Sequence, residues 1–271
     1  MYTTDELKQI AKKVRLGILE EVYSANSGHP GGALSCTDIL TALYFNLANI
    51  DPDNPQKEDR DRIILSKGHA SAALYSALAH RGYFDVSELK TFRKLHSNLQ
   101  GHPSLGKVKG VDMTSGSLGQ GLSIANGMAL AEKMDNKGYY TYVILGDGEI
   151  EEGQIWEAAM SAAHYKLNKL VVFVDNNNLQ IDGKITEVNS PTPISEKFAA
   201  FGFNVFEIDG HNFDEIQNAV ANAKQSQDKP TAIIAKTVKG KGVSFMENQV
   251  GWHGKAPNEE QYNMAIEELN K

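Results

Sequence analysis

The sequence has almost no cysteine: Cys36 is the only one among its 271 residues. A single thiol builds neither a disulfide framework nor a cysteine-rich zinc site, and this usage is typical of a reducing compartment. The sequence also lacks any His-Glu-x-x-His pair, so zinc hydrolase chemistry is a poor explanation. We therefore expect a cytoplasmic protein without structural zinc.

Basic clusters and long apolar runs are missing as well. Lys and Arg total 27 against 34 Asp and Glu, which gives a formal net charge of -7. No basic block offers a footprint for a phosphate backbone, so nucleic acid is excluded as an expected partner. The apolar runs are too short to cross a bilayer, and the first 23 residues lack the apolar core of a signal peptide. We expect no membrane partner.

Short apolar runs alternate instead with helical patterns. Apolar residues at helical spacing predict a first helix from a cap near Thr4, and a second helix is expected from about Cys36 to Leu47. Strand, turn and helix then repeat, with strands expected in "RIILS", "YYTYVILGDGE", "KLVVFVDNN", "NVFEIDGHN" and "TAIIAKTVKGKG". This alternation predicts an α/β fold, a mostly parallel sheet with helices on both faces. We expect one domain over residues 1–271, with a loop-rich tail from about residue 240.

Unusual residues follow the ends of the expected strands. In open parallel sheets the ligand crevice lies outside the carboxyl ends of the strands. We therefore expect one crevice to contain Gly68 with His69, Gly146 with Asp147 and Gly148, and Asn176 with Asn177.

Asp147 and Asn177 form the strongest candidate pair. The glycines on both sides of Asp147 would let the backbone approach a bulky anion, while a carboxylate and an amide oxygen suit magnesium that also holds phosphate oxygens. Each motif alone is more often an ordinary turn. Their position at two strand ends favours a magnesium diphosphate site.

The eight histidines fall into two groups. His80, His96 and His164 lie within helical patterns, and we expect only structural roles for them. The other five each adjoin a glycine in loops: His29, His69, His102, His211 and His253. Any one of these could simply bind its own loop, but together they suggest imidazoles that bind phosphate or move protons.

Two glycine-rich segments and one acidic run have competing interpretations. Gly116, Gly119 and Gly121 precede a long helix, where they could hold an anion or allow close packing, and their order is not the dinucleotide fingerprint. "GHPSLGKV" is not a phosphate loop, because Val108 replaces the Ser or Thr that would hold magnesium. The acidic residues could start a solvated helix or serve an interface or proton relay; they are Glu149, Glu151, Glu152 and Glu157.

Several segments together resemble the thiamine diphosphate-binding domain of transketolases: "SGHPGGALSCTDIL", "DRIILSKGHAS", "QGHP", "TSGSLGQGLSIANGMA", "GDGEIEEGQIWEA" and "VDNNNLQIDG". The resemblance implies thiamine diphosphate and Mg²⁺ as cofactors. It implies metal ligands at Asp147, Asn177 and the Leu179 carbonyl. It implies that His29, His102 and His253 face the sugar, that His253 can also touch the diphosphate, and that His69 lies around the cofactor. We expect catalytic roles for His29, His69, His102 and His253. The resemblance implies cofactor contacts at His69, Gly116, Ser117, Leu118, Gly146, Gly148, Asn177, Ile181 and His253.

The resemblance also implies a partner. Transketolases usually have two further domains, and the glutamate that activates the aminopyrimidine lies in the second, which this sequence does not contain. We therefore expect the N-terminal subunit of a split transketolase, active only with a C-terminal subunit that has the pyrimidine-binding domain, in an α2β2 assembly. It would move a two-carbon ketol unit from a ketose phosphate to an aldose phosphate. The alternatives are the α subunit of a 2-oxoacid dehydrogenase and a non-catalytic, cofactor-binding regulatory subunit. "SGHPG" is evidence against the first.

Overall fold

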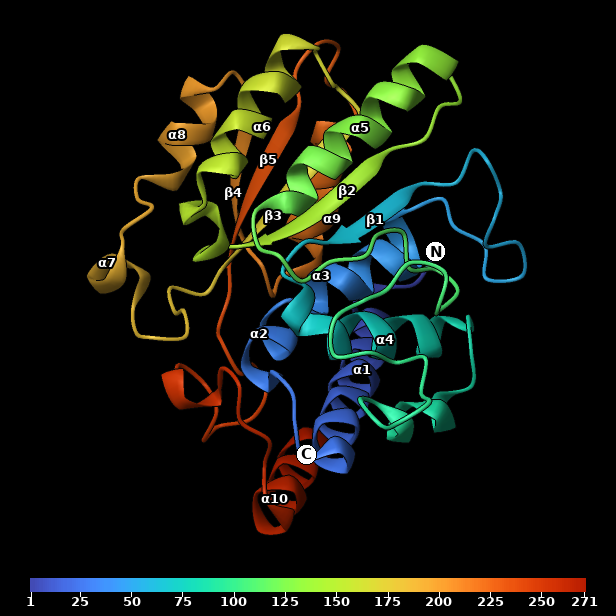
Figure 1. Ribbon diagram of the computed structural model, residues 1–271, viewed down its shortest axis with the longest axis vertical. Coiled ribbons are helices and arrows are strands. Elements are labelled where there is room, and N and C mark those ends of the chain that lie inside the picture. Colours follow the sequence, from blue (N-terminus) through green and yellow to red (C-terminus); the bar gives the residue numbers. More distant parts are fainter.

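The computed structural model describes residues 1–271, and its centre is one five-stranded sheet (Figure 1). The strand order is β1-β2-β3-β5-β4, and every neighbouring pair is parallel. The strands are β1 (Arg62–Leu65), β2 (Thr141–Gly146), β3 (Leu170–Asn176), β4 (Asn204–Asp209) and β5 (Thr231–Lys236). The parallel sheet expected from the alternation of short apolar runs and helices is confirmed, with all five strands where the sequence places them.

Helices cover both faces of the sheet. Along β1, Ile63 and Leu65 belong to one apolar cluster while Ile64 belongs to the other, because successive strand side chains point to opposite faces. The longer helices on the first face are α1 (Thr4–Ala25), α3 (Thr37–Ala42), α4 (Ser71–Arg81) and α9 (Phe213–Ala223). Those on the second face are α5 (Gln120–Asp135), α6 (Gly153–His164) and α8 (Ile194–Ala200), which lie in front in Figure 1. Burial on both faces explains why the strands read as continuous apolar runs.

The first two helical segments differ in detail from the expectation. The cap of α1 is Thr3 rather than Thr4: the Thr3 hydroxyl accepts from the Glu6 amide at 3.3 Å, and the Glu6 carboxylate accepts from the Thr3 amide at 2.7 Å. This reciprocal pair is a capping box, which needs Glu three residues after the cap. The second segment starts earlier than Cys36, with α2 (Pro30–Ser35), and a π-helical turn (Leu43–Leu47) follows α3. Proline at the first position of α2 explains the early start.

The remaining segments are short helices and loops. They include the 3₁₀ turns Gly68–Ala70, Val86–Thr91, Glu149–Glu151 and Val250–Trp252, and the helix α7 (Ile185–Val188). The helical placement expected for His96 is wrong, because this residue lies in a loop with φ +66°. No helix combines the length and the apolar character that a membrane crossing requires.

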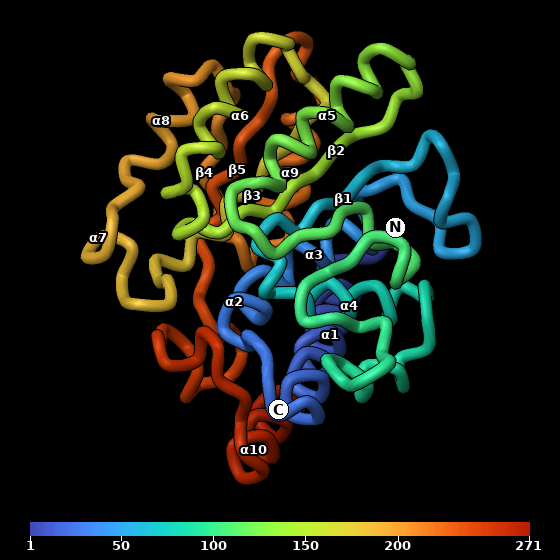
Figure 2. The backbone as a smooth tube through the Cα atoms, in the orientation of Figure 1, coloured from blue at the N-terminus to red at the C-terminus, as the bar shows by residue number.

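The tail beyond residue 240 is a loop that ends in a helix. After residues 237–249, which contain no regular helix or strand, the 3₁₀ turn at Val250 leads towards α10 (Glu259–Asn270). The ring of Tyr262 in α10 stacks on Tyr23 of α1, with centroids 4.2 Å apart. Figure 2 shows this segment in red, running past α2 to the end of α1. The tail therefore brings His253 back to the N-terminal part of the chain.

Candidate active site

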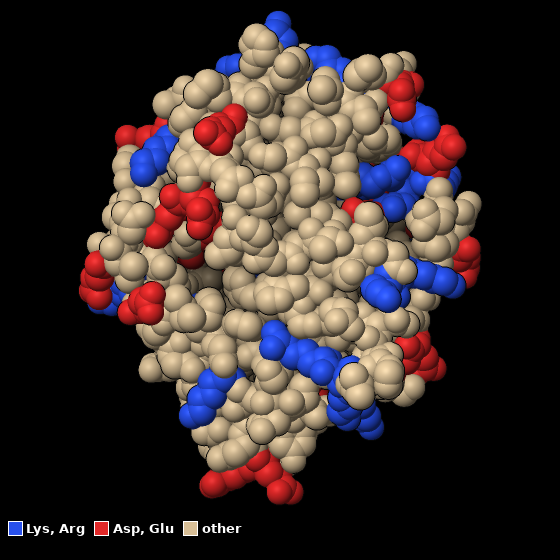
Figure 3. All heavy atoms as spheres, in the orientation of Figure 1, with Lys and Arg blue, Asp and Glu red and all other residues tan.

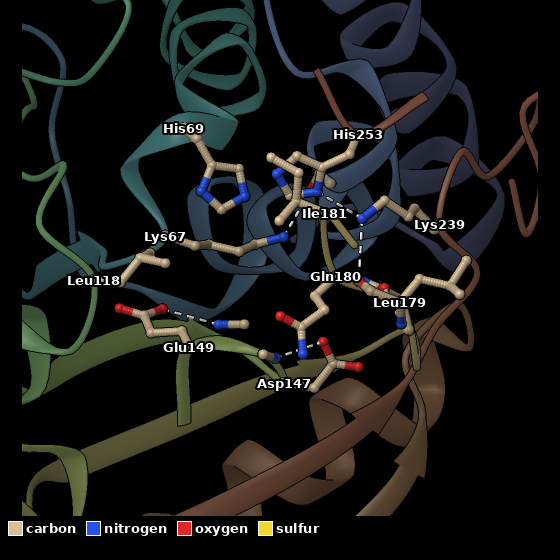
Figure 4. A pocket seen from close by; sticks show the side chains of 14 residues that line it. Lys67, His69, Leu118, Asp147, Glu149, Leu179, Gln180, Ile181, Lys239 and His253 are labelled. Carbon is tan, nitrogen blue, oxygen red and sulfur yellow. Dashed lines mark hydrogen bonds between the residues drawn. The ribbon is translucent and has the colours of Figure 1, made fainter. Parts of the chain in front are cut away.

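A cavity of about 220 Å³ opens at the carboxyl ends of β1, β2 and β3 (Figure 4). It is lined by Gly32, Lys67, His69, Leu118, Gly146, Asp147, Gly148, Glu149, Asn177, Leu179, Gln180, Ile181, Lys239 and His253. The expected meeting of strand-end residues in one crevice is confirmed for His69, Asp147 and Asn177. The close-up places His69 and His253 along one side of the cavity and Asp147 and Glu149 along the other.

Asp147 lies at the end of β2, directly beside the end of β3. Its carboxylate accepts hydrogen bonds from the backbone amides of Gly148 at 2.9 Å and Asn178 at 2.5 Å. Burial and the neighbouring Asp175 carboxylate raise the pKa of Asp147 to about 7. Ionisation of this carboxyl is therefore costly without a cation. A bound cation would stabilise the carboxylate form, so the position is suited to a cation.

The oxygen atoms around Asp147 are suited to a magnesium ion that also binds oxygens of a ligand. The Asn177 side-chain oxygen accepts from the Leu179 amide at 3.1 Å, and the Leu179 carbonyl accepts from the Lys239 ammonium at 3.1 Å. Carboxylate, amide and carbonyl oxygens are hard donors that Mg²⁺ prefers. No group of three His, Cys, Asp or Glu residues is placed to hold a metal. Asp147 is the carboxylate that is hydrogen-bonded to the segment containing Asn177 and Leu179. Water and ligand oxygens, such as those of a diphosphate, would complete a magnesium shell begun by these protein oxygens.

A buried ion pair supports Asn177 from behind. The Lys67 ammonium donates to the Asp175 carboxylate at 2.5 Å, and both side chains are almost fully buried. Burial alone would lower the pKa of Lys67, but Asp175 raises it above its usual value, so the lysine stays charged. Asp175 also accepts from the Asn177 side-chain NH₂ at 3.3 Å. This contact turns the Asn177 oxygen away from Asp175 and leaves it available to a metal.

Lys67 and Asp175 are not predicted from the sequence. Both lie next to recognisable sequence features: Lys67 directly follows the apolar run "RIILS", and Asp175 precedes the asparagine run. Their hydroxyl partners come from distant segments: Ser35 of α2 donates to Asp175 at 2.5 Å, and the Thr237 hydroxyl donates to it as well. Only the tertiary fold brings those segments together, so no local signal distinguishes Asp175 from an ordinary strand carboxylate.

Lys239 is the second cation of the cavity and is also not predicted. Its ammonium donates to the Leu179 carbonyl and, at 2.9 Å, contacts the Nδ1 atom of His253. Burial and the charge of Lys67 lower the pKa of Lys239 to about 8. At neutral pH it is mainly protonated, and because the charge of Lys67 is paired with Asp175, Lys239 is the cation that can attract an anion to this part of the cavity. In the sequence, "TVKGKG" indicates only the end of a strand, although its lysines flank a glycine.

Three predicted histidines form a cluster at the other end of the cavity. Ring centroids lie 5.3 Å apart for His29 and His69, 5.1 Å for His69 and His253, and 5.5 Å for His29 and His253. The approach of the tail to α2 needs glycine, because a Cβ at Gly31 would lie 2.8 Å from the Trp252 carbonyl oxygen. The fold thus brings His253 next to His29 and His69, which lie more than 180 residues earlier in the sequence.

All three histidines are neutral at physiological pH. Burial and the Arg93 charge lower the pKa of His29 to about 4, while burial and Lys239 lower that of His253 to about 3. Burial and Lys67 bring the pKa of His69 well below its usual value. A neutral imidazole has one donor and one acceptor nitrogen, so the cluster can bind sugar hydroxyls and transfer protons.

The remaining predicted contacts lie beside the cavity or only partly line it. Leu118, Gly146, Gly148 and Ile181 line it, whereas His29, His102, Gly116 and Ser117 do not. His102 is exposed next to Gly116, where a Cβ would lie 3.4 Å from the His102 ring. His211 belongs to another network, because its Nδ1 atom bonds to Asp38 at 2.7 Å and its Nε2 atom accepts from the Val238 amide at 2.9 Å. For His211 the alternative of a local hydrogen-bonding role is therefore confirmed.

Glu149 connects three segments that border the cavity. Its buried carboxylate accepts from the amides of Gly119 and Gly146, each at 3.0 Å, and from the Ser66 hydroxyl. It therefore connects the start of α5 and the ends of β1 and β2. The solvated helix start considered for the acidic run does not describe Glu149, because its side chain is buried. Gly121, in the first turn of α5, serves close packing, because a Cβ there would lie 2.2 Å from the Ser66 hydroxyl oxygen.

Comparison with known proteins identifies relatives of this chain. Residues 6–269 match the family described as "Transketolase, thiamine diphosphate binding domain". The chain is 48% identical to the 6-deoxy-6-sulfo-D-fructose transketolase subunit SqwG of Clostridium sp. (strain MSTE9), over 98% of this chain and 97% of that protein. It is 42% identical to one subunit of the apulose-4-phosphate transketolase of Phocaeicola vulgatus, over 98% and 95% respectively.

Larger relatives share the same fold over part of their length. Human transketolase is 38% identical over 97% of this chain, which spans 42% of the human protein. The crystal structure of transketolase from Campylobacter jejuni superposes with a TM-score of 0.92 at 37% identity, covering 99% of this chain and 43% of that one.

Proposed function

Because this chain belongs to the transketolase family and forms its thiamine diphosphate-binding domain, we propose that it is the N-terminal subunit of a split transketolase. Two relatives that are described as transketolase subunits match it over nearly their whole length, at 97% and 95%. Against single-chain transketolases it spans only about two fifths, for example 42% of the human protein. A separate C-terminal subunit with the pyrimidine-binding domain would complete the enzyme.

The observation that carries this proposal is the division of one cavity into two chemically different ends. At one end lie the Asp147 carboxylate, the hard neutral oxygens of Asn177 and Leu179, and the ammonium group of Lys239, with the Lys67–Asp175 ion pair beside them. At the other end lie three neutral imidazoles in mutual contact. The first end suits a metal-bound diphosphate, and the second suits a polyhydroxylated, uncharged portion of a ligand.

The residues that would hold the cofactor follow from this division. Mg²⁺ would bind Asp147, the Asn177 side-chain oxygen and the Leu179 carbonyl, with diphosphate oxygens completing its shell. Lys239 would neutralise the diphosphate, and Gly148 would allow its approach. When bound, thiamine diphosphate supplies the carbon centre that accepts the two-carbon unit. The remaining predicted cofactor contacts are His69, Gly116, Ser117, Leu118, Gly146, Ile181 and His253.

The histidines would act on the sugar. His69 and His253 lie at the cavity, with His29 beside them and His102 at the rim. As neutral imidazoles they can hold hydroxyl groups, donate to a carbonyl oxygen and move protons between neighbouring oxygens. Burial lowers the pKa of His102 as it does for the other three, so no histidine here needs a counterion. We assign sugar binding and proton transfer to His29, His69, His102 and His253.

The donor would be a ketose with an anionic end, and the acceptor an aldose phosphate. One relative is named for 6-deoxy-6-sulfo-D-fructose and another for apulose-4-phosphate, so the family members most similar in length differ in their sugar. Lys67 is paired with Asp175, and Lys239 contacts both the Leu179 carbonyl and His253, so neither ammonium group is free to bind a distal anion of the sugar. The residues that choose the sugar would therefore belong to the partner subunit.

The partner would bind the face formed by α5 and α6. Figure 3 shows few charged side chains in the middle of this face, with Lys, Arg, Asp and Glu gathered around its edges. Ile124 of α5 is 41% exposed and Met160 of α6 is 61% exposed. Exposed apolar side chains on an uncharged surface are typical of a protein interface. An α2β2 assembly would cover this face, and the single buried thiol of Cys36 supports a cytoplasmic location.

Purification of the tagged chain from its source cell tests the proposal. We expect a stoichiometric partner of similar length that contains a pyrimidine-binding domain, and two-carbon transfer only when both chains are present. The same assay with pyruvate in place of the ketose would reveal a 2-oxoacid dehydrogenase subunit. Recovery of this chain alone, with bound cofactor and no transfer activity, would contradict the proposal and favour a regulatory subunit.

A further inference from the structure

Arg93 combines a strained backbone with a charge that has no acidic partner. Its φ is +57°, a left-handed conformation that costs a non-glycine residue about 1 kcal/mol. No Asp or Glu lies within ion-pair distance of its guanidinium, although other arginines of the chain such as Arg15 and Arg60 have such partners. Strain that persists at a partly buried cation usually serves a function.

The guanidinium is directed to the histidine cluster instead. Its Nη1 atom donates to the Ser27 hydroxyl at 2.9 Å, and its Nη2 atom lies 3.4 Å from both the His29 Nδ1 atom and the Gly101 carbonyl oxygen. Gly101 makes this placement possible, because a Cβ there would lie 2.9 Å from the Arg93 Cζ atom. The left-handed turn at Arg93 thus places the guanidinium between the His29 turn and the segment that leads to His102.

The chemistry of these two side chains permits one arrangement of protons. A guanidinium only donates hydrogen bonds and does not lose its charge in proteins. His29 is neutral at physiological pH, since its pKa is about 4, so one ring nitrogen bears a hydrogen and the other accepts. The nitrogen that faces Arg93 must be the acceptor, and the hydrogen must be on Nε2.

We propose that Arg93 is a positioning residue that holds His29 in its Nε2–H form, so that His29 offers the sugar a hydrogen-bond donor. The Nε2 atom makes no hydrogen bond within the chain, whereas Nδ1 contacts Arg93. The inference rests on the proposed function for the identity of the ligand. It assigns His29 to hold or polarise a sugar oxygen, and it leaves proton acceptance to His69, His102 or His253.

Nitrogen NMR of the full chain tests the proton position without any activity measurement. The chain is labelled with ¹⁵N-histidine, and the signals of His29 are identified by their loss in His29→Gln. We expect the wild type to show the Nε2–H form alone, Arg93→Met to show a mixture of both forms, and Arg93→Lys to restore Nε2–H in part. Lys94→Met is the matched control, because this exposed neighbour should leave the signals unchanged. An Nδ1–H form in the wild type would overturn the proposal even if Arg93→Met did not fold.

A double-mutant cycle in the active complex separates positioning from direct substrate binding. We expect Arg93→Met to lower kcat/KM about tenfold in the wild-type background and less than about twofold when His29 is already Gln, since the arginine acts through His29. An equal loss in both backgrounds would show that Arg93 binds the substrate itself and would overturn the proposal. Complete inactivity of the wild-type complex would refute the proposed function, while the NMR result would still decide the proton position.

Discussion

The two ends of the cavity differ in how they treat charge. At the diphosphate end, formed by Lys67, Asp147, Asp175 and Lys239, ionised groups are buried within hydrogen-bond distance of one another or of backbone dipoles. At the histidine end, burial and nearby cations keep the imidazoles of His29, His69 and His253 neutral. Removal from water is offset by pairing for Lys67 and Asp175, shifts the pKa of Asp147 and Lys239 towards neutral pH, and leaves the imidazoles uncharged.

This difference indicates which task each end of the cavity is suited to. The charges at the first end suit a ligand of fixed charge, such as a metal diphosphate, whose binding would keep Asp147 ionised and Lys239 protonated. Neutral imidazoles bind weakly one by one but can donate and accept protons in turn. We therefore expect substitutions at the diphosphate end to alter stability and cofactor affinity, and substitutions at the histidine end to alter turnover.

The largest effect is expected for Lys67→Met. It would leave the fully buried Asp175 carboxylate without its cation and destabilise the fold by about 3–5 kcal/mol. Urea unfolding of the full chain measures the change. Lys184→Met is the control, since its pair with Glu187 has side chains that are 63% and 64% exposed and should contribute at most about 1 kcal/mol. A loss at Lys67 no larger than this control would show that the charged end is not held by pairing.

The next effect is expected for Asp147→Ala, which removes the only carboxylate of the predicted metal site. Because loss of a residue that merely supports a metal ligand costs about 10- to 100-fold in affinity, loss of a ligand should cost about 100-fold or more. Calorimetric titration of thiamine diphosphate with and without Mg²⁺ measures it. Asp182→Asn, an exposed change nearby, is the control. Unchanged affinity in Asp147→Ala would remove the metal assignment.

His102→Ala tests the other end. Since an imidazole that transfers a proton contributes about 100-fold or more and one that only binds contributes less, we expect turnover of the complex to fall about 10- to 100-fold. Cofactor affinity should stay within about twofold of the wild type. His96→Ala is a matched control, because His96 is an exposed loop histidine away from the cavity. Loss of cofactor binding in His102→Ala would erase the proposed distinction between the two ends.

A smaller effect is expected at a buried carboxyl outside the cavity. Glu21 of α1 is fully buried, and neither of its carboxyl oxygens has a hydrogen-bond partner. Burial raises its pKa well above the usual value. A carboxyl whose pKa is raised on folding contributes stability below its unfolded pKa, about 4.3, and this contribution is lost as the pH rises through the folded pKa.

Glu21→Gln should remove that pH dependence. Near pH 4 the free energy of unfolding of the variant should equal that of the wild type. By pH 7 the variant should be more stable by about 1–2 kcal/mol, because unfolding releases the Glu21 proton in the wild type only. Unfolding in urea across this pH range gives the difference, with Glu20→Gln as the neighbouring control. A difference that is constant with pH would indicate that the Glu21 carboxyl has a partner.

The sequence predicted the fold well because strands and helices have strong local patterns. All five strands lie in the quoted runs, because the strands inside the sheet are buried on both faces and need consecutive apolar residues, while the edge strand β4 is only partly buried. The cap at Thr3 and the early start of α2 were missed because helix ends depend on single contacts, such as that of Glu6. His96 was misplaced because its loop contains apolar residues at a helix-like spacing.

The candidate site was predictable only in part. Glycine-flanked residues at strand ends, such as Asp147 and His69, were visible, because backbone demands leave a local signature. Lys67, Asp175, Lys239 and Arg93 were not, because their roles depend on partners far away in sequence. Asp175 accepts from Ser35, which is 140 residues earlier, and that pairing exists only in the folded chain.

A crystal structure of the chain with its partner, Mg²⁺ and thiamine diphosphate tests the division of the cavity most directly. We expect one metal with Asp147, the Asn177 side-chain oxygen and the Leu179 carbonyl as ligands at about 2.0–2.1 Å. The diphosphate should lie beside Lys239, and the rest of the cofactor should extend towards His69 and His253. A diphosphate bound away from Lys239, or a metal that leaves Asp147 uncoordinated, would contradict the account.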